Sequence, residues 1–235
     1  MIRYSLVLLL ALAASCGGGD VVSDPPPAAP LDPTLTTAPV TDDPDDPAIW
    51  VHPTDPSKSL IIGTNKVAGP RGAVVVFGLD GAIRQVIAGI DRANNVDIEQ
   101  GVRLGGTTVD IAVVPERLQH RLRVFTIQAD GSGLSELGTV PVLTGETGDR
   151  SEPMGIGLYR RPADGAVFAI VSPKSGGATN YLWQYQLDAD GWHGVKGTLV
   201  RRFGNFSGIG ATPGEAGEIE AVVIELEASP SLMPA

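Results

Sequence analysis

Cysteine and histidine are scarce in this sequence of 235 residues. Cys16 is the only cysteine, so the chain forms no intrachain disulfide and has no cage of cysteine thiolates for zinc. The three histidines are His52, His120 and His193, which lie too far apart in the sequence for a local metal motif. These two shortages exclude disulfide-stapled scaffolds and zinc modules.

Basic residues are also few, since 17 Lys and Arg stand against 27 Asp and Glu, giving a net charge of −10. This balance excludes a general nucleic-acid binder that relies on a basic surface. A polyanionic ligand would need a local cluster of basic side chains or a bound metal.

Aromatic residues make up only 5% of the chain, and amphipathic helix patterns of ordinary length are lacking. Glycine and proline are abundant instead, at 30 and 19 residues. This composition excludes a coiled coil and favours many short segments joined by turns.

The N-terminus carries a targeting signal. Arg3 precedes an apolar run over residues 6–14, which has the length of a signal-peptide core and is too short to span a bilayer. The run ends in small residues before Cys16, as in a bacterial lipobox, although an ordinary signal peptide with an incidental cysteine is the alternative. We expect residues 1–16 to be a signal peptide, Cys16 to carry a lipid anchor to the membrane, and the protein to be exported.

A proline-rich stretch follows. Residues 17–39 are rich in proline and show no apolar periodicity, which is typical of an extended, semi-rigid tether. We expect the folded domain to occupy residues 40–235.

Three stretches of this domain repeat one pattern, in which an apolar run, an Asp-Gly pair and a second run follow one another. The Asp-Gly pairs begin at positions 80, 130 and 190. Asp-Gly between alternating apolar runs predicts a β-hairpin, and this spacing fits the blades of a propeller with loop insertions. The pattern predicts an all-β propeller and disfavours a dinucleotide site at Gly208 and Gly210.

A basic residue closes the strand that precedes each hairpin. These residues are Lys66, Arg117 and Lys174, spaced by 51 and 57 residues. Equivalent positions of successive blades lie at equivalent radii, so we expect three exposed cations to converge on a patch suited to phosphate groups. The alternative is that they are ordinary surface residues at strand ends.

Acidic and amide side chains gather before two of the strands. Asp45 and Asp46 belong to an Asp-Pro run, and Asn95 belongs to the segment NNVD at 94–97. Such oxygen ligands suit Ca²⁺, although Asp-Pro runs are also ordinary turn material.

The string TDDPDDPAIWVHPTDPSKSLIIGTNK, at 41–66, resembles the opening of the β-propeller phytases. These are bacterial, calcium-dependent enzymes of the 3-phytase type, which hydrolyse phytate (myo-inositol hexakisphosphate). Further matching segments are NNVDI, VDIAVVPER, GIGLYRRPADGAVFAIVSPK, GTLVRRFGNFSG and EIEAVV, so that the resemblance covers residues 41–223.

The resemblance implies roles for individual residues. Lys66, Arg117 and Lys174 would contact the phosphates of an inositol phosphate substrate and act in catalysis. Glu220 would lie at a catalytic calcium cluster and position the attacking water. Asp45 and Asp46 would contribute to calcium binding, and Asn95 would be a further ligand.

The sequence also departs from the family. Met154 stands where the family usually has a tyrosine, although Glu152 keeps a carboxylate nearby. About four blades of sequence are present, against the six that the family closes, so we expect a C-terminally truncated chain with little phytase activity by itself. A non-catalytic propeller that binds phosphate ligands is the alternative, and the order of phosphate removal, the number of calcium ions and the oligomeric state stay open.

Overall fold

The regular structure is almost entirely β-strand in the computed structural model, which describes residues 32–176, 179–191, 194–205 and 219–224. Residues 35–235 form one compact unit, and residues 1–34 form another of which only 32–34 are described. The strands are β1 (Pro44–Trp50), β2 (Leu60–Asn65), β3 (Ala73–Gly78), β4 (Ile83–Ala88), β5 (Asp97–Leu104), β6 (Thr107–Glu116), β7 (Arg121–Ile127), β8 (Leu134–Pro141), β9 (Pro153–Arg160), β10 (Val167–Pro173), β11 (Thr179–Asp190) and β12 (Gly194–Asn205). Three single turns of 3₁₀ helix accompany them, at Pro56–Lys58, Arg117–Gln119 and Gly148–Arg150.

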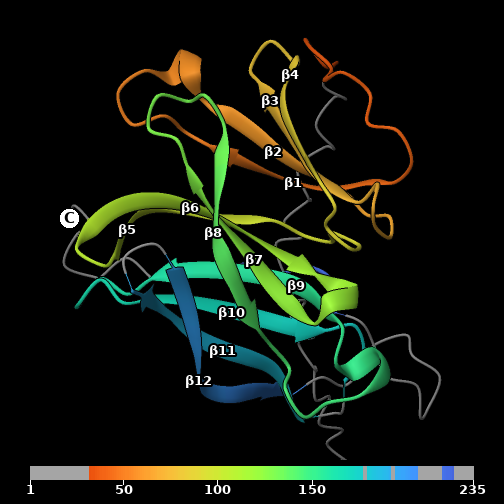
Figure 1. Ribbon diagram of the computed structural model, residues 1–235, viewed down its shortest axis with the longest axis vertical. Helices are drawn as coiled ribbons and strands as arrows, with labels where there is room; N and C mark the ends of the chain where they lie inside the picture. Colours follow the sequence, from red (N-terminus) through yellow and green to blue (C-terminus); the bar gives the residue numbers. More distant parts are fainter. Residues whose placement is uncertain (1–31, 177–178, 192–193, 206–218, 225–235) are drawn as a thin grey trace, which may run out of the picture. The chain divides into compact units, whose positions relative to one another are not determined.

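The described strands form three four-stranded antiparallel sheets, each built from four consecutive strands in chain order (Figure 1). The first strands of successive sheets contact one another, since β1 packs on β5 and β5 packs on β9. Sheets of this kind, stacked in sequence order, are the blades of a propeller. The predicted all-β propeller class is therefore confirmed.

Each predicted Asp-Gly pair forms a turn between the last two strands of its sheet. Gly81 joins β3 to β4, Gly131 joins β7 to β8, and Gly191 joins β11 to β12, with φ between 68° and 76°. This left-handed conformation is strained for residues with a side chain, which explains glycine at the second turn position.

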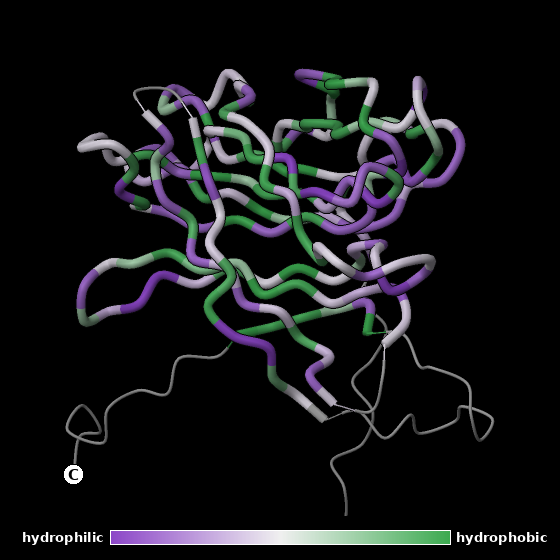
Figure 2. Tube along the Cα trace, turned by 60° about the horizontal axis from the view of Figure 1, so that its bottom comes forward, coloured by the Kyte–Doolittle hydropathy of each residue, from purple (hydrophilic) through white to green (hydrophobic). Residues whose placement is uncertain are grey.

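The middle sheet has an apolar core on each face, because side chains alternate along its strands. Ile111 and Val113 of β6 pack into the core shared with the third sheet. Ala112 and Val114, which alternate with them, pack into the core shared with the first sheet. Figure 2 shows the hydrophobic residues along the strands and hydrophilic residues in many of the turns. Two-sided burial explains why these strands read as nearly continuous apolar runs.

Residues 219–224 lie against β9. The hydroxyl of Ser172 donates to the carbonyl of Ile219 at 2.5 Å, and a Cβ added at Gly155 would lie only 2.8 Å from the Glu220 carbonyl oxygen. A Cβ at Gly157 would lie 2.9 Å from Val222. Both glycines of β9 therefore permit the close approach of this segment.

Residues shortly before β1 contact the first sheet. The backbone N–H of Ala38 donates to the carbonyl of Gly81 at 2.8 Å, and Val40 packs on a small apolar cluster of Ala73, Val75 and Phe77. The predicted signal peptide and residues 17–31 of the predicted tether lie outside the described residues. Among the residues that are described, no helix has the length and apolar character needed to cross a membrane.

Candidate phosphate-binding site

Three basic residues follow directly on the second strand of each sheet. Lys66 comes after β2, Arg117 after β6 and Lys174 after β10. The second strands occupy equivalent places in their sheets, so these residues share one end of the sheets. This is the arrangement that their spacing predicts.

Backbone hydrogen bonds connect the first two of these positions. The N–H of Arg92 donates to the carbonyl of Val67 at 3.0 Å, and the N–H of Arg117 donates to the carbonyl of Arg92 at 3.2 Å. Val67 directly follows Lys66. A single residue therefore bridges the ends of β2 and β6.

Glu152 connects the second and third positions. The N–H of Lys174 donates to the Glu152 carbonyl at 2.7 Å, and the Glu152 carboxylate lies 3.7 Å from Nε of Arg117. The three basic residues thus follow one another along a single edge of the sheets.

Carboxylates accompany the two lysines. Nζ of Lys66 donates to Oδ1 of Asp45 at 2.6 Å, and Nζ of Lys174 lies 3.2 Å from Asp149. The side chains of Lys66 and Lys174 are 19% and 30% exposed. Both lysine side chains are therefore half-buried, and neither is as exposed as their spacing predicts.

Oxygen atoms that could bind a metal gather near Lys66, from β1 and from the residues just before β5. Asp46 accepts the N–H of Val96 at 3.2 Å and is hydrogen-bonded to the side chain of Asn95. The amide of Asn95 donates to the carbonyl of Glu220 at 2.9 Å, while the amide of Asn94 donates to Asn95. Three of the predicted calcium ligands therefore come together, although Glu220 takes part through its backbone and its side chain is exposed.

Two buried oxygens of this cluster lack a hydrogen-bond partner among the described residues. They are Oδ2 of Asp45 and Oδ1 of Asn94. Buried oxygens without a donor are costly unless a cation or water satisfies them. Ca²⁺ accepts carboxylate, amide and backbone oxygens, so this donor set fits calcium. Over the described ranges, however, no group of three or more His, Cys, Asp or Glu side chains is placed to hold a metal.

Two neighbouring carboxyl groups have raised pKa values. Burial raises the pKa of Asp46, against hydrogen bonds from Val96 and Asn95 and together with repulsion from Asp45. Burial also raises the pKa of Asp97, which accepts the N–H of Leu158 at 2.6 Å. The fold therefore holds negative charge where it is poorly solvated, and a bound cation would offset this.

Comparison with known proteins identifies the family of the chain. The model of the phytase family matches residues 7–215. The chain belongs to the phytase family. It is also 34% identical over 163 residues to a 3-phytase of Bacillus subtilis (strain 168), across 68% of this chain. That match spans 39% of the length of the Bacillus protein, so the chain covers about two fifths of this relative.

Arg117 differs from the sequence-based expectation for this phytase-family chain. Its side chain is only 5% exposed, whereas we expected all three cations to be exposed. The guanidinium donates to the sulfur of Met154 at 3.0 Å and pairs with Glu152, both from β9 or the residue before it. The expectation of exposure was wrong because side chains of the next sheet cover this strand end.

Sequence reasoning missed several contributors to the phytase-family site. Asp149 carries no spacing signal, since its partnership with Lys174 arises from a 3₁₀ turn in a loop. Asn94 was visible only as a member of an amide run.

Cys16, the predicted lipid attachment point, lies outside the described residues.

Proposed function

We propose that this chain belongs to a calcium-dependent phytase, which hydrolyses phosphomonoesters of phytate. The observation that carries the proposal is the row of Lys66, Arg117 and Lys174 beside a cluster of oxygen donors, in a chain of the phytase family. The 3-phytase name of the Bacillus subtilis relative supports the substrate class.

The basic row binds and orients the substrate phosphates. Lys66 and Lys174 turn from their carboxylate partners toward the phosphate oxygens, forming charge-assisted hydrogen bonds. Arg117 is buried and is held in one position by Glu152 and Met154, so it contributes a fixed positive charge to the row.

Calcium would be held by Asp45, Asp46, the amide oxygens of Asn94 and Asn95, and Glu220. When bound, it supplies positive charge against the phosphate oxygens and acidifies water for attack. The exposed carboxylate of Glu220 would orient the attacking water. The oxygen of water bonds to phosphorus, the bond from phosphorus to the inositol oxygen breaks, and that oxygen takes up a proton.

Binding without hydrolysis is a second candidate function. One observation favours it, namely that no group of three or more His, Cys, Asp or Glu side chains in the described residues is placed to hold a metal. Calcium takes six to eight oxygen ligands, so ligands from outside these residues would be needed for catalysis.

Phosphate release from calcium phytate distinguishes the two functions. We would compare the 235-residue chain with a chimera that also carries the part of the Bacillus subtilis 3-phytase that the 163-residue match does not cover. We expect little release from the chain alone and calcium-dependent release from the chimera. A folded chimera that releases no phosphate would contradict the phytase proposal and favour binding alone.

We also propose that the protein is exported and anchored to a membrane by a lipid on Cys16. The short apolar run over 6–14 and the small residues before this cysteine support the proposal. Labelling of cells with a radioactive fatty acid tests it, because a Cys16→Ser variant would then carry no label; an unlabelled wild-type chain would contradict it.

A further inference from the structure

Residues 89–96 connect β4 of the first sheet to β5 of the second, and we call them the connecting segment. This segment contacts two loops, residues 66–72 after β2 and residues 117–120 after β6. The two loops begin with the basic residues Lys66 and Arg117. Ile90 and Ala93 of the segment are fully buried, so the connection is a fixed part of the fold.

The connecting segment is hydrogen-bonded to the loop that begins at Lys66. The N–H of Gly89 donates to the carbonyl of Pro70 at 3.1 Å, and the N–H of Ile90 donates to the carbonyl of Gly72 at 3.0 Å. Glycine at position 72 permits this close approach, because an added Cβ would overlap the Ile90 carbonyl oxygen. The connecting segment therefore fixes the backbone that follows Lys66.

Asp91 is hydrogen-bonded to both loops. Its Oδ1 accepts the N–H of Gly69 at 2.9 Å in the first loop, and its Oδ2 accepts the side-chain amide of Gln119 at 2.9 Å in the second. Its carbonyl also accepts the N–H of Leu118 at 3.2 Å. The hydrogen bonds from Gly69 and Gln119 lower the pKa of Asp91, so the carboxyl group is ionised at neutral pH and accepts both bonds there.

Two neighbours hold Asp91 in this place. The N–H of Asp91 donates to Oε1 of Glu116 at 2.9 Å, and Glu116 is buried at 1% exposure. Arg92 has a left-handed φ of 62°, which is uncommon for a residue with a side chain. Its N–H donates to the carbonyl of Val67, whereas its carbonyl accepts the N–H of Arg117. The strained conformation therefore directs the two backbone groups of one residue to different loops.

Lys66 and Arg117 belong to different sheets, so their separation depends on what joins the two strand ends. A displacement of about 1 Å in a site that positions a substrate can cost on the order of a hundredfold in rate. We propose that Asp91 is a positioning residue, which holds the loops after Lys66 and Arg117 at a fixed separation. Because its carboxylate is negative, it acts through these residues and does not itself bind phosphate. The inference rests on the proposed function for the roles of the two basic residues.

Binding of myo-inositol hexakisphosphate to the full chain, measured by calorimetry in calcium, tests the role of Asp91. Asp91→Ala removes both hydrogen bonds of the carboxylate, and we expect it to weaken binding about tenfold. An effect of charge alone predicts the opposite, because loss of a carboxylate near a site for anions should strengthen binding. Asp91→Asn keeps an oxygen for the N–H of Gly69 and gains an amide that can donate to the Gln119 oxygen. This variant should therefore restore the affinity.

Asp130→Ala is the matched control. Asp130 is also exposed and accepts the N–H of Ser132 at 2.9 Å, but it lies in the turn between β7 and β8, at the end of β7 away from Arg117. We expect this variant to bind like the wild type. Gln119→Ala removes one of the two hydrogen bonds from an exposed residue and should weaken binding several-fold. It provides the same test if Asp91→Ala does not fold.

A double-mutant cycle with Lys66→Ala shows whether Asp91 acts through Lys66. The loss of affinity in the double variant should be smaller than the product of the two single losses, because a misplaced Lys66 and a missing Lys66 remove the same contact. Losses that multiply would overturn the inference.

Wild-type affinity in Gln119→Ala and in Asp91→Ala would also overturn the inference, as would equal losses in Asp91→Ala and Asp91→Asn. If Lys66→Ala binds more weakly than the wild type in these cases, the proposed function stands without a positioning role for Asp91. Wild-type affinity in Lys66→Ala would overturn the proposed role of the basic row and this inference together.

Discussion

Burial of the Tyr185 side chain makes the free energy of unfolding depend on pH. Its hydroxyl accepts the backbone N–H of Leu143 at 2.8 Å, and the side chain lies in the core between the second and third sheets. Burial raises the pKa of Tyr185 to about 12 from the usual 10.0. The folded protein therefore keeps this proton at pH values where the unfolded chain has lost it.

The unfolded chain binds fewer protons than the folded chain between the two pKa values, so the free energy of unfolding should fall as pH rises above about 10. Tyr185→Phe should reduce this fall. At pH 7 the same variant should lose about 1–3 kcal/mol, because the N–H of Leu143 loses its acceptor. Urea unfolding of the wild type and of Tyr185→Phe, at pH 7 and across pH 9 to 11, measures these free energies. An equal fall in both proteins between pH 9 and 11 would contradict the raised pKa of Tyr185.

At the scale of the strand, the contact between β9 and residues 219–224 joins the fold to the site. Asn95 reaches the Glu220 carbonyl, and Gly155 lets that segment come close. A Cβ contact of 2.8 Å is shorter than real Cβ atoms show, so a side chain at Gly155 must displace the Glu220 backbone.

Gly155→Ala should therefore destabilise the fold by about 1–3 kcal/mol through overpacking, and should also weaken stabilisation by calcium. Gly63→Ala in β2 is the matched control, since an added Cβ there meets its nearest atom at 3.6 Å. Chemical denaturation with and without calcium measures both effects. Equal stability and equal stabilisation by calcium in the two variants would show that the contact of residues 219–224 with β9 does not affect the site.

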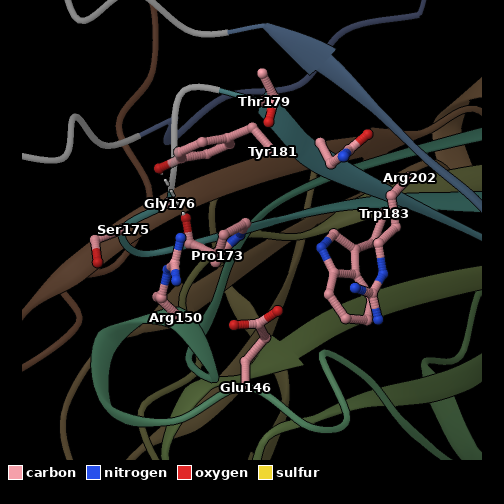
Figure 3. Close-up of a pocket in the computed structure, with 10 residues that line it drawn as sticks. Glu146, Arg150, Pro173, Ser175, Gly176, Thr179, Tyr181, Trp183 and Arg202 are labelled. Atoms are coloured by element: carbon pink, nitrogen blue, oxygen red, sulfur yellow. Dashed lines mark hydrogen bonds between the residues drawn. The ribbon is translucent and has the colours of Figure 1, made fainter.

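The strands and hairpins could be predicted because their signals are local. An Asp-Gly pair specifies its turn within two residues, and Lys66, Arg117 and Lys174 stand one residue beyond their strands as the sequence indicates. The burial of Arg117 could not be predicted, because Met154 covers it from the next sheet, 37 residues along the chain. The pocket lined by Arg150, Trp183 and Arg202 (Figure 3) could not be predicted for the same reason, since residues of loops and of distant strands build it together.

At the scale of the whole molecule, we expect cations to stabilise the fold, because the chain is acidic and two buried oxygens, Oδ2 of Asp45 and Oδ1 of Asn94, have no hydrogen-bond partner among the described residues. Calcium at 100 times its dissociation constant should add about 2.7 kcal/mol to the free energy of unfolding. The melting temperature should therefore be higher in millimolar calcium than in chelator. Asp45→Asn should reduce this difference, whereas Asp80→Asn, in an exposed pair with Arg84, should not. Equal melting temperatures in calcium and in chelator would contradict the metal assignment.

The central claim is that the ends of β2, β6 and β10 form a phosphate site that works with calcium. The most direct test is the binding of myo-inositol hexakisphosphate to the full chain, in calcium and in chelator, with Lys66→Ala, Lys174→Ala and the control Lys58→Ala, which removes an exposed lysine next to β2. Each lost charge-assisted contact should weaken binding by about 1.5–3 kcal/mol. We predict that binding is tighter in calcium, that both site variants lose affinity, and that Lys58→Ala binds like the wild type. Equal affinity in all four proteins, with or without calcium, would contradict the account.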